Sequence, residues 1–184
     1  MKTLSTLTAA VALLVGAGAV QAADVYSNGG STKDGTTAIS GNPFAGFNIG
    51  LGLGAEFPTD ATQAFFRGDL RGGYNFVNKE GWLAGLYGEV SLLNVPEATD
   101  PLLGYGGGVK LGKVLGNSNL AYVYGGYDAL SVPYGRVDGY SVGGGFETLI
   151  APHWSIGAEG GYFDYPNVNF DGFRAAVRTS FYVN

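Results

Sequence analysis

The charged side chains of this chain are few, and many of them stand at alternate positions in apolar segments. On either side of Leu70, for example, Arg67, Asp69 and Arg71 alternate with apolar residues or glycine. Carboxylates and guanidinium groups placed in this way can form hydrogen-bonded ion pairs away from water, or can line a path for ions. Five acids and five bases share this placement, so the set is neutral: Glu56, Arg67, Asp69, Arg71, Glu89, Lys110, Glu147, Glu159, Arg174 and Arg178.

The segments that carry these charges have the pattern of β-strands with two different faces. From Phe47 to Phe57, apolar residues alternate strictly with glycine or polar residues, a period of two that fits an extended strand. The pattern recurs along the chain. It predicts strands near residues 44–57, 65–77, 82–93, 102–114, 120–130, 134–150, 154–165 and 170–183.

The predicted strands are long, and the connections between them alternate in length. Most strands exceed the ~5 to 6 residues usual in globular proteins and cover the ~9 to 11 that a tilted strand needs to cross hydrocarbon. The tight connections are 78–81, 116–119 and 151–153, and the mostly longer ones are 58–64, 94–101, 131–139 and 166–169. Short periplasmic turns and longer outer loops are typical of outer-membrane barrels. The sequence therefore predicts an all-β fold, an eight-stranded antiparallel up-and-down transmembrane β-barrel over residues 44–184.

We interpret the ten charged residues as an ion-pair network that plugs the lumen of this barrel. Eight strands leave an interior just wide enough for side chains, and opposite charges that are neighbours offset the cost of burying each other. Much of the remaining inward face is glycine, which leaves room for water. A narrow, low-conductance porin for small solutes is therefore kept as the alternative function.

Aromatic residues on the opposite face gather where odd-numbered strands begin and even-numbered strands end, which is one rim of the barrel. Amphipathic rings prefer the level of the lipid headgroups. The predicted lipid-interface girdle consists of Tyr74, Phe76, Trp82, Tyr122, Phe146, Trp154 and Phe181.

Alternation alone does not say which face is inside. A soluble periplasmic ligand carrier of the lipocalin type, with the apolar face lining a pocket, is therefore the lesser alternative. Against it stand the scarcity of lysine on the polar face, the balance of charges, the strand length and the girdle. A soluble outer surface would normally be ~25 to 35% charged.

One segment has the residue types of a hydrolase site. His153 and Ser155 form a His-x-Ser pair with Glu159 nearby, as a nucleophile with its base requires, and the pattern resembles that of eight-stranded barrels that deacylate lipid A. We expect no catalysis, because His153 falls in a predicted periplasmic turn while Ser155 and Glu159 point into the barrel. With a single histidine and no cysteine, we expect no metal site and no cofactor.

Acidic residues also occur in the predicted loops. Solvated carboxylates there could attract divalent cations that bridge lipopolysaccharide, but such residues are more often a solubilising rim. The acids interpreted as this rim are Asp60, Glu97, Asp100, Asp128, Asp138, Asp164 and Asp171.

The N-terminus has the features of a secretory signal peptide. Lys2 precedes an apolar stretch over residues 4–20, and a small-x-small pattern ends at Ala22, near which we expect cleavage. Residues 1–22 are thus predicted to be a signal peptide and residues 23–43 a flexible periplasmic leader. Removing Lys2 leaves nine Lys and Arg against fifteen Asp and Glu, an acidic balance without the footprint of a nucleic-acid-binding protein. Because there is no cysteine, the exported domain must be stable without disulfides.

Four segments carry a family resemblance. Residues 44–54, FAGFNIGLGLG, resemble the opening strand of the small Gram-negative outer-membrane β-barrels of the opacity and surface-antigen type, found especially in alphaproteobacterial surface antigens and "porin family" proteins. Residues 140–147 are similar to the sixth strand of that family, 151–159 to its last periplasmic turn and seventh strand, and 173–183 to its closing strand. The motifs are short and rich in glycine, so they indicate architecture far better than activity.

The resemblance implies an outer-membrane protein of a Gram-negative bacterium that is inserted by the barrel assembly machinery and has a structural, adhesive or immunogenic role. Its expected partners are outer-membrane lipids, lipopolysaccharide and a host or surface ligand that contacts the loops, and we expect a monomer. One departure concerns assembly: such chains usually end in an aromatic residue, whereas this sequence ends in FYVN. Either the assembly signal is read from Phe181 or Tyr182, or insertion is inefficient.

Overall fold

The computed structural model describes residues 42–96, 100–133 and 135–183, so the predicted signal peptide, most of the predicted leader and Glu97 lie outside the described residues. No helix within these ranges is long and apolar enough to span a membrane. The described chain forms eight strands and one short 3₁₀ helix, η1 (Pro166–Val168). The strands are β1 (Gly46–Pro58), β2 (Phe65–Val77), β3 (Trp82–Asn94), β4 (Leu102–Leu115), β5 (Asn119–Val132), β6 (Gly135–Ala151), β7 (Trp154–Tyr165) and β8 (Phe170–Val183).

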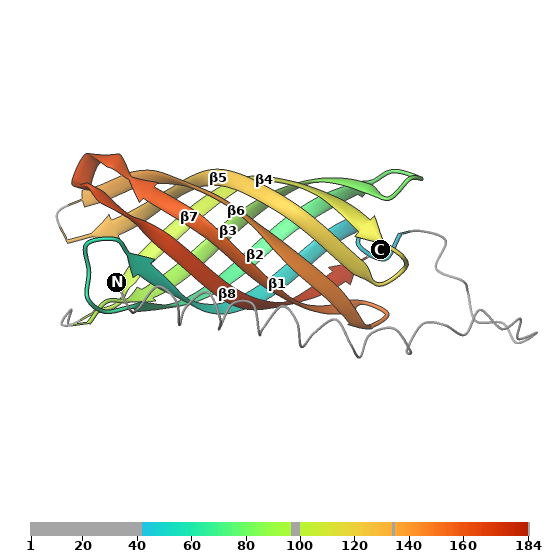
Figure 1. Cartoon of the computed structure of the whole chain (residues 1–184), viewed down its shortest axis with the longest axis horizontal. Helices are drawn as coiled ribbons and strands as arrows, with labels where there is room; N and C mark the ends of the chain where they lie inside the picture. The colour runs from blue at the N-terminus through green and yellow to red at the C-terminus, as the bar shows by residue number, and fades with distance from the viewer. Residues whose placement is uncertain (1–41, 97–99, 134, 184) are drawn as a thin grey trace, which may run out of the picture.

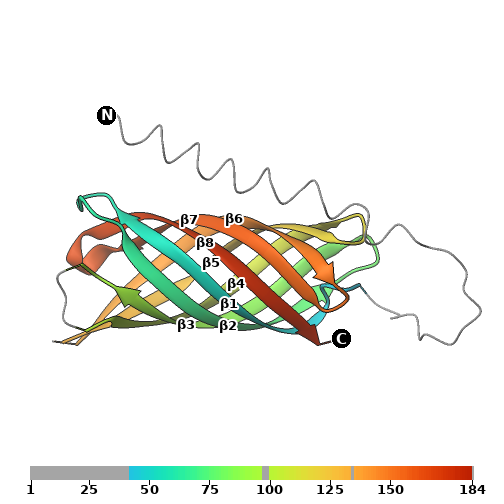
Figure 2. The ribbon, with the colours of Figure 1, turned by 90° about the horizontal axis from the view of Figure 1, so that it is seen from below.

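The eight strands form a closed antiparallel barrel in which each strand pairs with the next and β8 pairs with β1 (Figures 1 and 2). Following paired residues once around the barrel leads from Phe47 on β1 to Phe57 on the same strand, a stagger of ten residues. Stagger of this kind tilts the strands across the barrel axis, and closure leaves no unpaired sheet edge. The predicted fold class is confirmed.

The alternation of the sequence decides which face of each strand points outward. On β1, Leu51 and Leu53 are 60% and 76% exposed, whereas Gly50, which precedes Leu51, and Gly52, which lies between the two leucines, are buried. The outer wall of the barrel is therefore apolar, and the parity that carries the charges points into the lumen. This arrangement is the reverse of a water-soluble globular protein, in which large apolar side chains gather inside.

The strand bounds agree with the sequence prediction to within two residues at each end. One loop prediction was wrong: residues 131–139 are not a long loop, because β5 continues to Val132 and β6 begins at Gly135. Pro133 and Gly135 are residue types that favour turns, and Gly135 has a φ of 141° that favours glycine, so the two strands can be joined by a short connection. Phe44 also lies before β1 rather than in it; its ring is fully buried, and its carbonyl oxygen accepts a hydrogen bond of 3.0 Å from Asn75.

The lumen is filled in three layers. We call the end with connections 78–81, 116–118 and 152–153 the turn end, and the opposite end the loop end; the last strand finishes at the turn end (Figure 1). The turn-end cluster consists of Phe44, Leu83, Val114, Leu120, Tyr122, Tyr124, Leu149 and Tyr182. The loop-end cluster consists of Leu93, Leu130, Phe163 and Tyr165, with Phe65, Leu102 and Phe170 packed against it. Charged side chains occupy the space between the two apolar clusters.

Candidate functional site

The charged layer is assembled from alternate residues of several strands. Arg67, Asp69 and Arg71 follow one another at every second position of β2, so all three side chains point into the lumen. Strands β1, β3, β7 and β8 add further charges at the same depth. Because the barrel is closed, side chains that are far apart in the sequence meet across its axis.

The centre of the layer is the pairing of Arg71 with two carboxylates. The two terminal nitrogens of Arg71 donate to the two carboxylate oxygens of Glu159 at 3.0 and 3.1 Å, and its Nε donates to Glu89 at 2.8 Å. Arg178 approaches from β8, donating to Glu159 at 2.7 Å and to Asp69. Bidentate pairs of this kind fix both position and orientation, since the guanidinium fork matches the carboxylate.

Toward the loop end the network continues through two more arginines. Arg67 donates to Glu56 at 2.9 Å and to Glu89, which links it to the centre. Arg174 lies 3.4 Å from Glu56 and 3.1 Å from Asp128. One connected set of ion pairs therefore reaches from β1 and β2 across to β5 and β8.

Toward the turn end a smaller group is centred on Glu147. Its carboxylate lies 3.3 Å from the ammonium of Lys110 and accepts hydrogen bonds from Ser155 at 2.9 Å and Tyr182 at 2.7 Å. The Lys110 ammonium also stands 4.2 Å from the ring centroid of Tyr122, within cation–π range. This group joins the charged layer to the turn-end cluster.

The structure brings all ten sequence-predicted lumen residues into the interior, each in an ion pair. It also adds one that sequence reasoning missed. Asp128 was placed in a solvated loop, but it lies on β5, is 8% exposed and faces Arg174. The set therefore has six acids and five bases rather than a balanced five and five. Asp128 lies two residues before Leu130 and shares its inward face, but apolar residues occupy both faces of this strand, so the spacing alone did not identify it.

Tyr122 was wrongly assigned to the lipid-facing girdle. Its side chain is buried in the lumen, and its hydroxyl donates to Glu159 at 3.0 Å. The error has a physical cause: from Leu120 to Tyr124 every side chain is apolar or aromatic, so alternation does not distinguish the two faces there. A tyrosine fits either face, because it has an apolar ring and a polar tip.

The other proposed girdle residues lie on the outer wall. Tyr74, Phe76, Trp82 and Trp154 are exposed, while Phe146 and Phe181 are half-buried. The Trp154 and Phe181 rings pack with centroids 5.1 Å apart. Aromatic residues also occur on the outer wall nearer the loop end, where the sequence analysis assigned no girdle: Phe66, Tyr105, Tyr127, Tyr140, Tyr162 and Phe173.

Hydrogen bonds connect several of these tyrosines to aspartates of the adjacent strand. The hydroxyls of Tyr140 and Tyr162 donate to Asp164 and Asp171, at 2.8 and 3.1 Å, and Tyr127 donates to Asp138. The hydrogen bond from Tyr127, with the ion pair to Arg136, lowers the pKa of Asp138 below its usual value. Arg136 and Asp138 belong to β6 rather than to a loop. The repeated Tyr–Asp contact forms a polar rim around β5 to β8 at the loop end.

The residue types of a hydrolase are present but do not pair with one another. The Ser155 hydroxyl donates to Glu147 inside the barrel, while His153 Nδ1 lies 3.1 Å from the carbonyl oxygen of Tyr182. Glu159 is engaged by Arg71 and Arg178. Across the described ranges, no group of three or more His, Cys, Asp or Glu side chains is arranged to hold a metal ion.

The interior leaves little free space among the charges. A cavity bordered by Arg71, Glu89, Glu159 and Arg178 measures about 10 Å³, near the lower limit of ~10 to 15 Å³ for one water molecule. Inward glycines contribute to this packing rather than opening a channel. At Gly108, an added Cβ would lie 2.3 Å from the carbonyl oxygen of Gly125. The charged side chains are thus paired with one another, and the cavity among them is no larger than about one water molecule.

Comparison with solved structures gives matches to small outer-membrane barrels. Neisserial surface protein A (NspA) aligns with a TM-score of 0.53 at 11% identity, over 74% of this chain and 96% of that one. Ail of Yersinia pestis, solved in a phospholipid bilayer nanodisc, aligns with a TM-score of 0.50 at 12% identity, over 74% and 98% of the two chains. Ail in complex with the heparin analogue sucrose octasulfate aligns with a TM-score of 0.50 at 12% identity, over 74% and 95%.

These matches confirm the resemblance at the level of the fold, an eight-stranded outer-membrane type of barrel. At identities this low they show the architecture alone. No protein-family model and no curated protein matches the sequence. Function must therefore be argued from the arrangement of the residues.

Proposed function

We propose that this chain is an integral outer-membrane β-barrel with a structural and surface role, whose lumen is sealed rather than conducting. The observation that carries the proposal is the distribution of polarity, which is the reverse of that in a water-soluble protein: an apolar outer wall surrounds an interior of ion pairs. A closed barrel satisfies every backbone hydrogen bond within itself, as a structure surrounded by hydrocarbon must. A signal peptide, as predicted for residues 1–22, would direct the chain out of the cytoplasm.

The three layers of the lumen support the sealed barrel over the narrow porin. A solute entering from the loop end would first meet Phe163 and Tyr165, both fully buried. Beyond them it would have to separate the Arg71–Glu159 pair, and then pass the turn-end cluster around Leu120. Separating a buried ion pair leaves uncompensated charges in a medium that solvates them poorly.

The soluble carrier requires the opposite arrangement. A lipocalin-like protein presents polar residues to water and binds an apolar ligand inside, whereas here Leu53 and Phe66 are 76% and 72% exposed on the outside. The charged middle layer would make a poor site for an apolar ligand. An apolar wall of this extent fits a lipid environment.

The loop end is the surface proposed to face the exterior, and its charge constrains the surface ligand. On the described loop-end surface, the acidic residues outnumber the basic ones. The base is Arg136, and the acids include Asp60, Asp100, Asp138, Asp164 and Asp171. The Ail structure holds a sulfated sugar, but a polyanion would be repelled by this acidic rim. A neutral or cationic partner is the better match for the described loop-end surface.

Conductance in planar bilayers tests the sealed lumen. Purified mature protein should give no stepwise openings, and Arg71→Ala should remain silent as long as both apolar clusters stay packed. Stepwise openings in the wild type that change with Arg71→Ala or Glu89→Ala would overturn the proposal in favour of a pore. Empty bilayers with detergent alone serve as the control.

Orientation and location are tested in cells. An epitope inserted after Asp60, in the connection between β1 and β2, should be accessible on intact Gram-negative cells, and the protein should fractionate with the outer membrane. The same epitope inserted after Asn117, in the turn between β4 and β5, is the matched control and should become accessible only after permeabilisation. Equal accessibility of both, or recovery in the soluble fraction, would contradict the proposed topology.

A further inference from the structure

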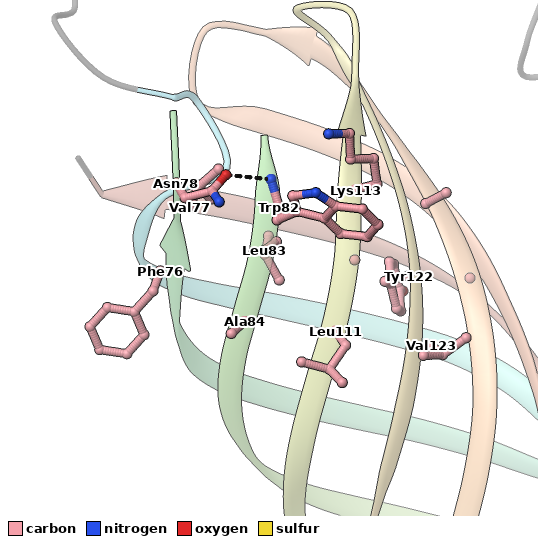
Figure 3. A pocket seen from close by; sticks show the side chains of 13 residues that line it. Phe76, Val77, Asn78, Trp82, Leu83, Ala84, Leu111, Lys113, Tyr122 and Val123 are labelled. Carbon is pink, nitrogen blue, oxygen red and sulfur yellow. Dashed lines mark hydrogen bonds between the residues drawn. The ribbon is translucent and has the colours of Figure 1, made fainter. Parts of the chain in front are cut away.

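The outer wall has a groove at the turn end, across β2 to β5. Its volume is about 840 Å³, within the range of small-molecule sites. Figure 3 shows Trp82 beside Lys113 at the end nearer the turns, with Leu111 and Val123 further along the strands. The outward side chains that border it are Lys113 and the apolar residues Phe76, Trp82, Ala84, Leu111, Ala121 and Val123.

The groove exists because small and large residues alternate across neighbouring strands. In one row of paired residues Ala84 stands between Phe76 and Leu111. In the next row, two residues closer to the turns, Lys113 pairs with both Trp82 and Ala121. The small side chains of the two alanines form the floor of the groove, and the large apolar side chains around them form its walls.

One strand residue that faces outward at the turn end of this groove is a cation, Lys113. The Lys113 ammonium lies 4.7 Å from the Trp82 ring centroid and donates to the carbonyl oxygen of Glu80. An ammonium has three donors, so two remain after this bond. Of the lysines and arginines on the described strands, five point into the lumen and Arg136 lies at the loop end, which leaves Lys113 as the cation on the outer wall at this end.

We propose that this groove binds an anionic phospholipid from the leaflet at the turn end. An acyl chain lies along Ala84, Leu111 and Val123, and the headgroup phosphate contacts the Lys113 ammonium at the level where Trp82 marks the interface. With Lys79 and Glu80 in the adjacent turn, the three charged groups around this end of the groove sum to one positive charge. A cation at a membrane surface attracts anionic lipid, so charge complementarity selects the occupant.

A second groove on the same barrel provides an internal control. It lies across β6, β7, β8, β1 and the start of β2 and has a volume of about 640 Å³. Its outward lining is apolar and includes Leu53, Ala55, Phe66 and Ala158, with no lysine or arginine among its lining residues. It offers acyl chains a similar surface without a cation, so it should not discriminate between headgroups.

The proposal rests on the membrane barrel proposed above, and one experiment separates the two. The chain has two tryptophans, one beside Lys113 and one at the same end without a neighbouring lysine. Trp154→Phe leaves Trp82 as the reporter, and Trp82→Phe leaves Trp154. Each variant is refolded into phosphatidylcholine vesicles in a buffer of low ionic strength. The vesicles contain a small mole fraction of either brominated phosphatidylglycerol or brominated phosphatidylcholine.

Brominated phosphatidylglycerol should quench Trp82 more strongly than brominated phosphatidylcholine, corresponding to a roughly fivefold enrichment beside the lysine. Trp154 should be quenched equally by both lipids. Lys113→Gln should abolish the preference and Lys113→Arg should retain it. Ala121→Leu should reduce it by filling the groove, whereas Ala158→Leu, in the second groove, should leave it unchanged.

Equal quenching of Trp82 by the two lipids would overturn the lipid site while leaving the membrane barrel intact. A preference that persists in Lys113→Gln would also overturn it, because the selectivity would then come from elsewhere. Absence of quenching at both tryptophans by either lipid would instead contradict the membrane barrel itself.

Discussion

The middle of the lumen and its two ends are held together by different forces. In the middle, Arg71, Glu89 and Glu159 are fixed by directed, charge-assisted hydrogen bonds. At the ends, apolar side chains such as Leu120 and Leu130 are buried by packing within their own clusters. The difference shows how one narrow barrel obtains both specificity and closure. Ion pairs are satisfied only in one strand register, while apolar clusters exclude water from them.

The largest effect is expected from breaking the middle layer. Glu89 and Glu159 share two cationic partners, Arg71 and Arg178, and Arg71→Ala removes the one that binds Glu159 in bidentate fashion, which leaves buried carboxylates short of positive charge. We expect a loss of ~3 to 5 kcal/mol in the free energy of unfolding, measured by urea titration of the barrel in lipid vesicles. Arg136→Ala, which removes an exposed ion pair at the loop end, is the matched control and should leave the midpoint unchanged. Equal midpoints for both variants would mean that the middle layer contributes no stability.

The turn end should respond to loss of packing rather than to loss of charge. Leu120→Ala deletes a fully buried side chain and leaves a cavity in the turn-end cluster, at a cost of roughly 2 to 5 kcal/mol. The loss of unfolding free energy in Leu120→Ala should not depend on the charge of the surrounding side chains, whereas the loss in Arg71→Ala should. Val123→Ala, on the outer wall three residues away, shortens a side chain without opening an internal cavity and should cost less. A larger loss for Val123→Ala would place the important apolar contacts outside the barrel.

The sequence predicted the middle layer better than the ends, and the reason is physical. A charge at every second position, as in Arg67, Asp69 and Arg71, has only one low-energy face in a membrane barrel, so ten lumen residues could be identified from spacing. Apolar and aromatic residues are tolerated on both faces. Tyr122 was therefore placed outside, and the apolar clusters at the two ends went unnoticed. Asp128 was missed because its neighbours on β5 supply no contrast that marks the inward face.

Glycines test whether the two faces differ as the packing indicates. Inward Gly108 has no room for a Cβ, which would lie 2.6 Å from the Gly126 Cα, whereas outward Gly72 has nothing within 4 Å of that position. Gly108→Ala should lower the free energy of unfolding by ~1 to 3 kcal/mol through overpacking. Gly72→Ala should be neutral or stabilising by ~0.4 to 1 kcal/mol, because it restricts the unfolded chain. Matched urea titrations measure both, and a loss for Gly72→Ala would show that the outer face is packed against something.

The smallest effect is expected at the exposed rim, where Asp138 pairs with Arg136 and Tyr127 in contact with solvent. These partners lower the pKa of Asp138, so any stability that they contribute is present above the ordinary pKa of an aspartate and is lost as the pH falls through the lowered value. The difference in unfolding midpoint between wild type and Asp138→Asn should thus be small at neutral pH and disappear in acid. Salt should reduce it as well, because exposed charges are screened, whereas the effect of Arg71→Ala should persist in salt because that pair is shielded from solvent. A rim contribution that resists both acid and salt would mean that Asp138 acts through packing, and the contrast between buried and exposed ion pairs would not hold for this barrel.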